Sequence, residues 1–446
     1  MKKSLFFITT LFMASAVFSQ VSLLESRSKV NWTKREFKSN INLNVDKADI
    51  PMPSGRQTAI NLINTRVPDL VKDPLLTLNV DSSRKISDLV LDEEITYHDL
   101  ADIISTSKCT TGYFAKDSSV LNTNHTMELS KLSSLFVKHS VPYKPSKPIS
   151  QVSSKKYSGI IIDARGKLPV HGEFMIEEVA PCFFPRIFND EMDLIYEKNM
   201  VDPALIRKTG ICYYDYSDDE SRYTDIVGNN PLHILALESF GDNRSDIIIK
   251  KEDALRILCV KENYDLLKNG KIVILLEKDQ LIYDVAAPVK DEAYYTAVAK
   301  LKMWDLPPVI GPDQIEIGTE DIKFLYNLKF IPDSPELLPE ELPRIKDCAQ
   351  KLKDLLSISA FTIFVGGHTA DIGQPVNQMN LSKERAITII NALIKEGIPQ
   401  ELFSYRGYGA TVPAKGGDNK TPEGRAVNRR VEITLRPRTT YIQRAN

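Results

Sequence analysis

The feature that most constrains this chain is a set of four short blocks near its C-terminal end. G-G-H-T-A-D-I-G spans Gly366 to Gly373, and N-L-S-K-E-R-A spans Asn380 to Ala386. G-Y-G stands at Gly407 to Gly409, and N-K-T-P-E-G-R-A-V-N-R-R-V-E closes the set at Asn419 to Glu432. Several blocks at fixed separations are far more specific than one short motif, so this stretch can be assigned to a fold.

The residues around these blocks follow the periodicities of strands and helices. Apolar residues alternate with polar ones from Ile322 to Phe330 and from Val431 to Arg436, as in strands with one face on a core. An apolar stripe at helical spacing runs from Ile345 to Leu356, and a second ends at Gly397, a residue that commonly terminates helices. Together with two further strands, they predict a β-α-β-α-β-β sandwich in which two helices pack on one face of a sheet.

These blocks resemble those of the C-terminal domain of the OmpA family, the domain that holds peptidoglycan non-covalently. The resemblance covers about Asp321 to Pro437, a little over a quarter of the chain. It implies a receptor for the zwitterionic diamino acid of the stem peptide. In the family, the Asp after G-H-T holds the ammonium group, and the Arg of the L-S-x-x-R-A block holds the carboxylate. Arg385 matches this Arg by spacing and could hold a carboxylate through two parallel hydrogen bonds.

One position departs from the family pattern. Ala370 stands where the family has Asp, and the carboxylate comes one residue later, at Asp371. Losing one partner of a desolvated charge pair costs about 2–5 kcal/mol, so two outcomes stay open. In the first, the glycine-containing loop shifts and Asp371 takes the anionic role. In the second, Asp371 faces solvent, peptidoglycan binding is weak or lost, and the domain serves protein docking or structure.

Other residues of the blocks complete the candidate site. Gln378 stands where the family usually has Asn and can still hydrogen-bond. His368 is expected to hydrogen-bond within its loop, since no nucleophile stands at a recognisable spacing from it. No catalytic residue, metal ligand or cofactor is expected. The candidate peptidoglycan-binding residues are Asp371, Arg385, Thr369, Gln378, Arg425 and Asn428.

A chain of 446 residues is too long for one ordinary core, so two or three domains are expected. Its 42% hydrophobic and 26% charged content is typical of a folded soluble protein, and its net charge of −2 gives no basic field that would indicate nucleic acid. The predicted fold class is multidomain α+β, with mixed α/β N-terminal and middle domains. The expected boundaries are a signal peptide at 1–19, an N-terminal domain at 20–142, a linker at 143–157, a middle domain at 158–306, a linker at 307–320, the OmpA-like domain at 321–437 and a tail at 438–446.

The first residues have the pattern of a signal peptide. Lys2 and Lys3 precede an apolar run from Leu5 to Val17, and small residues suit a cleavage site before Gln20. The apolar run is too short to serve as a stable membrane anchor. We therefore expect an exported, periplasmic protein without a transmembrane segment, and any association with the outer membrane would pass through a partner.

Five widely spaced cysteines form no C-x-x-C pair, which argues against a disulfide framework or a zinc site. Buried free thiols are the favoured interpretation. A single bridge between Cys182 and Cys212 is the alternative in an oxidising compartment.

The upstream segments mix helical and strand patterns. Apolar residues at 59–67 predict a helix, and Leu76 to Val80 alternates as a half-buried strand does. In the middle domain, the apolar runs Ile160–Ile162, Ile247–Ile249 and Lys271–Leu276 predict buried strands. A helical pattern lies between the last two runs, so they form a βαβ-like unit.

Asp163 and Arg165 stand at the exit of the first of these buried strands, where α/β proteins often place binding groups. Two interpretations stay open. The pair belongs to a site for a small ligand or a metal, or it stabilises a turn as a local charge pair. No partner motif is visible for a site.

Three functions are compatible with these patterns. The first is a non-enzymatic periplasmic envelope protein that tethers to peptidoglycan and presents two upstream domains to envelope partners. The second is an envelope scaffold whose OmpA-like domain no longer holds peptidoglycan. The third, an exported enzyme with a site in the middle domain, is the least supported, because the chain has no G-x-S-x-G, H-E-x-x-H or phosphate-loop motif.

Overall fold

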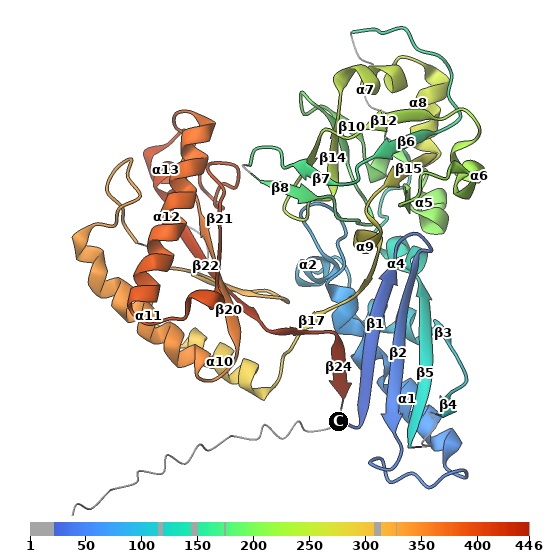
Figure 1. The fold of residues 1–446 in the computed structure, drawn as a ribbon, viewed down its shortest axis with the longest axis horizontal. Helices are drawn as coiled ribbons and strands as arrows, with labels where there is room; N and C mark the ends of the chain where they lie inside the picture. Colours follow the sequence, from blue (N-terminus) through green and yellow to red (C-terminus); the bar gives the residue numbers. More distant parts are fainter. Residues whose placement is uncertain are drawn as a thin grey trace, which may run out of the picture.

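The computed structural model describes residues 22–114, 119–143, 150–173, 175–306, 314–326 and 328–445. The signal peptide predicted at 1–19 lies outside these residues, as do parts of both predicted linkers. Helices and strands are both abundant, and the strands form several separate sheets. The chain is therefore a multidomain α+β protein, as predicted. Figure 1 shows an N-terminal sheet, a middle α/β body beyond one end of it, and a C-terminal body to one side.

The N-terminal domain is built on a seven-stranded antiparallel sheet in the order β16-β1-β2-β5-β3, with β24 also paired to β1 and β4 to β5. The strands are β1 (Leu24–Asn31), β2 (Glu36–Asn44), β3 (Lys108–Cys109), β4 (Tyr113–Phe114), β5 (Val120–Glu128), β16 (Ile282–Asp284) and β24 (Ile442–Ala445). The helices are α1 (Arg56–Leu76), α2 (Ile86–Leu91), α3 (Tyr97–Ser105) and α4 (Leu129–Leu135).

Alternating burial along the three long strands accounts for this sheet. In β1, β2 and β5, every second side chain is buried. The predicted helix at 59–67 is confirmed as part of α1, which buries Ile63, Val67 and Leu70 in the same core. The sheet therefore has one face on the core under α1.

The half-buried strand predicted at Leu76 to Val80 is wrong. The helix α1 continues to Leu76, and Leu78 and Val80 are buried in a turn. In this segment, Asn79 forms an isolated antiparallel β-bridge with Lys85, outside any strand. Alternating burial alone produced the strand-like pattern, because two apolar side chains anchor an irregular segment.

The middle domain contains two four-stranded sheets and a hairpin. One sheet is parallel, in the order β11-β15-β6-β12, and the other has the order β10-β9-β14-β13. The strands are β6 (Ile160–Asp163), β7 (Lys167–Pro169), β8 (Ile176–Glu178), β9 (Ile187–Asn189), β10 (Leu194–Tyr196), β11 (Tyr213–Asp215), β12 (Leu232–Leu235), β13 (Glu238–Phe240), β14 (Asp246–Ile249) and β15 (Ile272–Leu275). The helices are α5 (Pro203–Thr209), α6 (Thr224–Val227), α7 (Lys251–Leu258), α8 (Lys261–Lys268) and α9 (Lys278–Leu281).

The three buried strands predicted in this domain are confirmed as β6, β14 and β15, which are almost entirely buried. The βαβ-like unit is wrong, however. The strands β14 and β15 flank α7 and α8 in sequence, yet they lie in different sheets. Apolar runs report burial on both faces but do not specify the neighbouring strand, and two adjacent sheets share this core.

From its first predicted strand onward, the C-terminal domain has the predicted β-α-β-α-β-β order, with a short helix added before the last strand and a strand added in front of the first. Its five-stranded sheet has the order β18-β19-β22-β20-β21. The strands are β18 (Ile315–Ile317), β19 (Ile322–Leu325), β20 (Phe361–Gly367), β21 (Phe403–Gly407) and β22 (Val431–Pro437), and the helices are α11 (Leu342–Leu356), α12 (Pro375–Lys395) and α13 (Pro422–Asn428). The strand predicted at 322–330 ends early, at Leu325.

The helix α10 (Glu292–Lys302) falls inside the predicted middle domain, but it packs elsewhere. Its buried Tyr294, Ala297 and Leu301 belong to the hydrophobic core of the C-terminal domain, together with Leu306. Figure 1 shows α10 alongside the sheet of this domain, below α11. The C-terminal body thus begins before the predicted boundary at 307–320.

The last residues, predicted as a tail, form strands. Thr439–Thr440 (β23) pairs with Ala287–Pro288 (β17), and β24 pairs with β1 at the edge of the N-terminal sheet. The strand β16 pairs with the other half of β1. The C-terminal body is therefore inserted between two strands of the N-terminal sheet, and Figure 1 places the end of the chain beside β1.

The five cysteines are free; Cys182, Cys212 and Cys348 are buried, whereas Cys109 is exposed. None of the helices in the described part of the chain combines the length and the apolar character that crossing a membrane requires.

Candidate functional site

The glycines of the C-terminal blocks allow two strands to approach α12 closely. A Cβ atom on Gly367, at the end of β20, would lie 2.0 Å from the backbone oxygen of Ser382. A Cβ atom on Gly407, at the end of β21, would lie 2.6 Å from the backbone nitrogen of Lys383. No side chain fits at either distance, so these positions require glycine for packing. The Ser382 hydroxyl accepts a hydrogen bond from the N–H of Gly409 at 2.9 Å, which fixes G-Y-G on the helix.

Arg385 lies on the same stripe of α12 as Ser382 and is 6% exposed. Its Nε donates to the Ser334 carbonyl at 3.1 Å, and its guanidinium lies 4.9 Å from the centre of the Phe330 ring. Among the described residues, it makes no ion pair with a carboxylate and no other hydrogen bond. Burial lowers the pKa of Arg385, Arg429 lowers it further, and Asp333 opposes them. Within the part of the chain that the structure describes, this side chain is thus a buried cation without an ion pair, and Asp333 acts on it from beyond ion-pair distance.

The anionic half of the predicted receptor is displaced. Ala370 is 5% exposed, so the position of the family Asp is buried but has no polar side chain. Asp371 is exposed, and its carboxylate accepts a hydrogen bond from Gln378 Nε2 at 3.4 Å. Its backbone N–H donates to the side chain of Asn419 at 3.1 Å.

The structure brings Asp371 and Gln378 together, but it does not bring Asp371 and Arg385 together. Gln378 and Arg385 both lie on α12, seven residues apart, which is about 10 Å along a helix axis. Accordingly, Gln378 contacts Asp371, whereas Arg385 contacts Phe330 and Ser334. Asp371 and Arg385 therefore do not form the compact pair of opposite charges that the family pattern implies.

Asn428 and Arg425 organise the loop that precedes α13. Asn428 is 1% exposed; its Oδ1 accepts from the N–H of Ala414, and its Nδ2 donates to Gly417 and Asn419. Arg425 donates to the carbonyls of Asn419 and Lys420. Both side chains are thus engaged with backbone and loop groups, so their contribution to a site is to shape it.

His368 and Thr369 are buried beneath the loop. The His368 ring stacks on Tyr408 with centroids 4.9 Å apart, and its Nε2 lies 3.6 Å from Glu432. Burial lowers the pKa of His368, which favours the neutral ring. Burial alone would raise the pKa of Glu432, but His368, Arg430 and Lys323 outweigh it and hold this pKa well below its usual range. These groups form the floor under the loop, and the side-chain hydrogen bond predicted for His368 has no counterpart among the described residues.

Three contributors to this site were missed in the sequence. Ser382 stands inside a quoted block, so its position was visible although its bond to Gly409 was not. Phe330 and Ser334 lie some fifty residues before Arg385, beyond the end of β19; Phe330 was assigned to the predicted strand at 322–330, and Ser334 belongs to no periodic pattern. A contact between such distant segments leaves no local signal in one sequence.

The charge pair expected after the first buried strand of the middle domain is present. Arg165 Nη2 lies 2.6 Å from Asp163 and 2.7 Å from Asp218. Among the described residues, no three His, Cys, Asp or Glu side chains are placed to hold a metal ion, so the metal interpretation has no support there.

Comparison with family models divides the chain into three matched segments. The model described as the OmpA family matches residues 329–429. Residues 23–135 match the N-terminal domain of Treponema pallidum Tp0624, and residues 159–278 match the second domain of the same protein. No family had been assigned to the two upstream segments from the sequence.

Curated relatives align with the C-terminal part of the chain. Outer membrane protein A of Bordetella avium is 31% identical over 146 residues, which are 32% of this chain and 73% of the relative. The probable lipoprotein YiaD of Escherichia coli is 31% identical over 149 residues, and outer membrane porin F of Pseudomonas fluorescens is 33% identical over 114 residues. The alignments cover 32% and 26% of this chain, and the chain spans 64% of YiaD and only 33% of porin F.

Solved structures also align with this chain over a limited part. The periplasmic domain of Helicobacter pylori MotB is 26% identical, with a TM-score of 0.25 over 29% of this chain and 85% of that one. The cell wall anchor of the T6SS from Pseudomonas aeruginosa is 25% identical, with a TM-score of 0.23 over 28% of this chain and 87% of that one.

Proposed function

The chain belongs to the OmpA family through its C-terminal domain, and from this we propose that it is a non-enzymatic cell-envelope protein that associates with peptidoglycan. In this proposal, the segment 321–437 contacts the stem peptide in the periplasm. The N-terminal and middle domains are presented to envelope partners. The signal-peptide pattern of the first residues supports export.

The observation that carries the proposal is that Arg385 is buried and, among the described residues, has no ion pair. A buried charge without a partner is costly, and proteins rarely keep one without a role. Its two terminal nitrogens make no hydrogen bond among the described residues, while Nε is anchored to Ser334. This arrangement leaves the guanidinium oriented and available for a carboxylate, the group that the family's arginine receives from the stem peptide.

A second candidate function rests on Ala370. Because this buried position lacks a carboxylate, the ammonium group of a stem peptide would have no partner there. Asp371 is hydrogen-bonded to Gln378, and Gln378 stands about two helical turns from Arg385 on α12, so in this alternative Asp371 does not replace the missing group without a rearrangement of the loop. In this alternative, the domain is an envelope scaffold that acts through protein contacts.

Co-sedimentation with purified sacculi separates the two functions. If the protein tethers, the wild type pellets with sacculi, and Arg385→Ala weakens binding by about 30-fold or more, as expected for a lost charge partner. Asp371→Ala also weakens binding only if the Asp371 carboxylate binds the ammonium group of the stem peptide. Lys383→Ala, an exposed cation on the same helix, is the matched control and should bind as the wild type does.

The result that overturns the tether is a wild-type protein that stays in the supernatant. If Ala370→Asp then restores sedimentation, the domain is a receptor that lost its anionic half, and the scaffold function is correct. If neither protein sediments, Arg385 serves a different anion.

A further inference from the structure

The four parallel strands of the middle domain end in a single row. Asp163 at the end of β6 is in register with Leu235 of β12 on one side and with Leu275 of β15 on the other, and Leu275 pairs with Asp215 of β11. The crevice outside the carboxyl ends of parallel strands is where open α/β sheets bind ligands. A ligand site is therefore expected along this row of strand ends.

The two faces of this sheet are covered unequally. Ile160, Ile162 and Ile234 belong to the large core that the middle and N-terminal domains share. The opposite face carries a small cluster in which Ile161 and Leu275 pack with Tyr223, next to the short helix α6. Tyr223 and α6 do not cover β12 on this face.

On the open part of that face, Leu235 is 67% exposed and the His233 side chain is 59% exposed. The result is a cavity of about 330 Å³. This volume is at the lower end of the range for small-molecule pockets.

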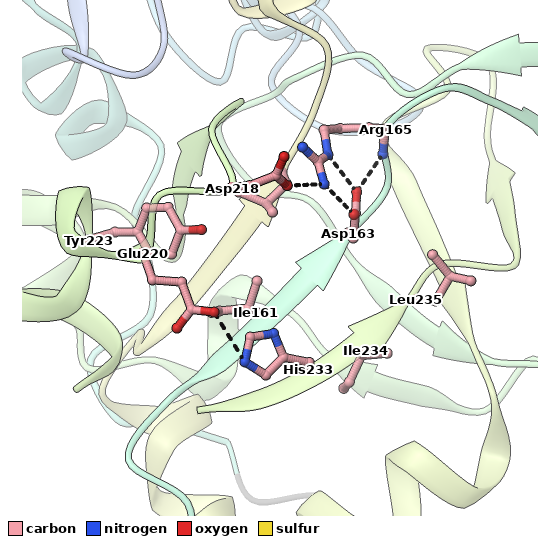
Figure 2. Close-up of a pocket in the computed structure, with 10 residues that line it drawn as sticks. Ile161, Asp163, Arg165, Asp218, Glu220, Tyr223, His233, Ile234 and Leu235 are labelled. Atoms are coloured by element: carbon pink, nitrogen blue, oxygen red, sulfur yellow. Dashed lines mark hydrogen bonds and ion pairs between the residues drawn. The ribbon is translucent and has the colours of Figure 1, made fainter. Parts of the chain in front are cut away.

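The lining of this cavity combines an apolar floor with polar groups at two ends. Figure 2 shows Ile161 between an upper group, formed by Arg165, Asp163 and Asp218, and a lower pair, formed by His233 and Glu220. His233 Nε2 lies 3.4 Å from Glu220 Oε1. Apolar floors with a few convergent polar groups are typical of sites that orient a small ligand.

Arg165 does not offer its charge to a ligand. Its Nε and Nη2 donate to the two oxygens of Asp163 at 2.9 and 2.6 Å, and Nη2 also lies 2.7 Å from Asp218. Nη1 faces the carbonyl of Tyr216 at 3.4 Å. The protein thus occupies four of the five N–H donors of the guanidinium and neutralises its charge, which disfavours an anionic ligand.

The carboxylates of the cavity outnumber its cations. Asp163, Asp218 and Glu220 face one guanidinium, an excess of two negative charges when His233 is neutral. The Glu220 side chain is 44% exposed and lies opposite the exposed Leu235 end of the floor. A ligand that complements this cavity carries positive charge and an apolar part.

We propose that this cavity is a binding site for a small organic amine with a short apolar chain. The ammonium group would bond to Glu220, with Asp218 as a further acceptor, and the chain would cover Leu235 and Ile161. This site lies in the middle domain, so it is independent of peptidoglycan binding by the C-terminal domain.

Calorimetric titration of the full chain tests the proposal with matched probes. Pentylamine and 1,5-diaminopentane should bind at least about tenfold more tightly than neutral 1-pentanol, because a hydrogen bond to a charged group is worth about 1.5–3 kcal/mol. Pentanoate should bind more weakly still. Glu220→Gln should remove most of the preference for the amines, and Leu235→Trp, at an exposed position, should block every probe.

Glu252→Gln is the control, since Glu252 pairs with Arg256 on α7, outside the cavity. Thermal unfolding of each variant confirms that it folds. The proposal is wrong if pentylamine binds no better than 1-pentanol, or if pentanoate binds best. It is also wrong if Glu220→Gln and Leu235→Trp both bind the amines as tightly as the wild type does.

Discussion

At the scale of single residues, Arg385 differs from Arg244, which is also buried. Arg244 is 5% exposed and is paired with Glu173 and Glu177, so its burial is compensated. Arg385 is buried to the same extent, and among the described residues no carboxylate pairs with it. A buried ion that lacks its partner destabilises a fold, whereas a ligand that supplies the partner stabilises it.

Replacing Arg385 by Met tests this assignment. We expect Arg385→Met to leave the free energy of unfolding unchanged within about 1 kcal/mol or to raise it, because removal of an unpaired buried charge offsets the lost bond to Ser334. Urea unfolding of the protein without ligand provides the measurement, and Lys383→Met is the exposed control. A loss of more than about 3 kcal/mol would show that Arg385 is a structural residue.

The sequence named candidate residues but could not give their geometry. The spacing of the blocks made Arg385 and Asn428 candidates, and both side chains are buried. It left open where the Asp371 carboxylate points, because a shift of one residue in a loop is decided by the backbone around it. That backbone depends on Asn419, whose side chain accepts from the N–H of Asp371 across 48 residues of sequence. Asn428 in turn donates to Asn419 and holds it in place.

At the scale of elements, helices were predicted more securely than strand partners. The stripes of α11 and α12 fix which face each helix buries, since helical periodicity is local. Strand pairing is not local, so neither the separation of β14 from β15 nor the pairing of β24 with β1 left a signal. A four-residue strand at the end of the chain resembles a polar tail until its partner is known.

Removing β24 should expose the edge of the N-terminal sheet. A chain that ends at Thr440 loses the pairing of Leu24 to Arg27 with residues 442–445, which corresponds to about 2 kcal/mol or more at roughly 0.5 kcal/mol for each ladder bond. We expect a lower unfolding midpoint and more aggregation, because an unpaired edge accepts other strands. Thermal unfolding with light scattering measures both, and a chain ending at Ala445 is the control. Equal behaviour of the two chains would contradict this role of β24.

At the scale of the whole molecule, the three segments are connected by more than linkers. The N-terminal and middle domains share one core, in which the Trp32 ring lies edge-on to Phe183 and Tyr214. The hairpin of β7 and β8 extends from the middle domain toward β21 of the C-terminal body (Figure 1). At this contact, Arg406 of β21 reaches carboxylates of the hairpin, so the C-terminal body is docked on the middle domain as well as inserted in the N-terminal sheet.

This docking depends on a chain of alternating charges. Glu177 accepts from Arg406 at 3.0 Å and from Arg244 at 2.6 Å, and Glu173 bonds to Arg244 at 2.9 Å. Since Arg244 compensates both carboxylates, the hairpin should stay folded without Arg406. Arg406→Ala should therefore release the C-terminal body from the hairpin and speed amide exchange in residues 167–178 about fivefold, the factor for roughly 1 kcal/mol. Hydrogen exchange by mass spectrometry measures this, with Arg436→Ala, which lies over Phe364 of its own domain, as the control. Unchanged exchange in Arg406→Ala would mean that the middle domain alone holds the hairpin and that the two bodies are joined only through the N-terminal sheet.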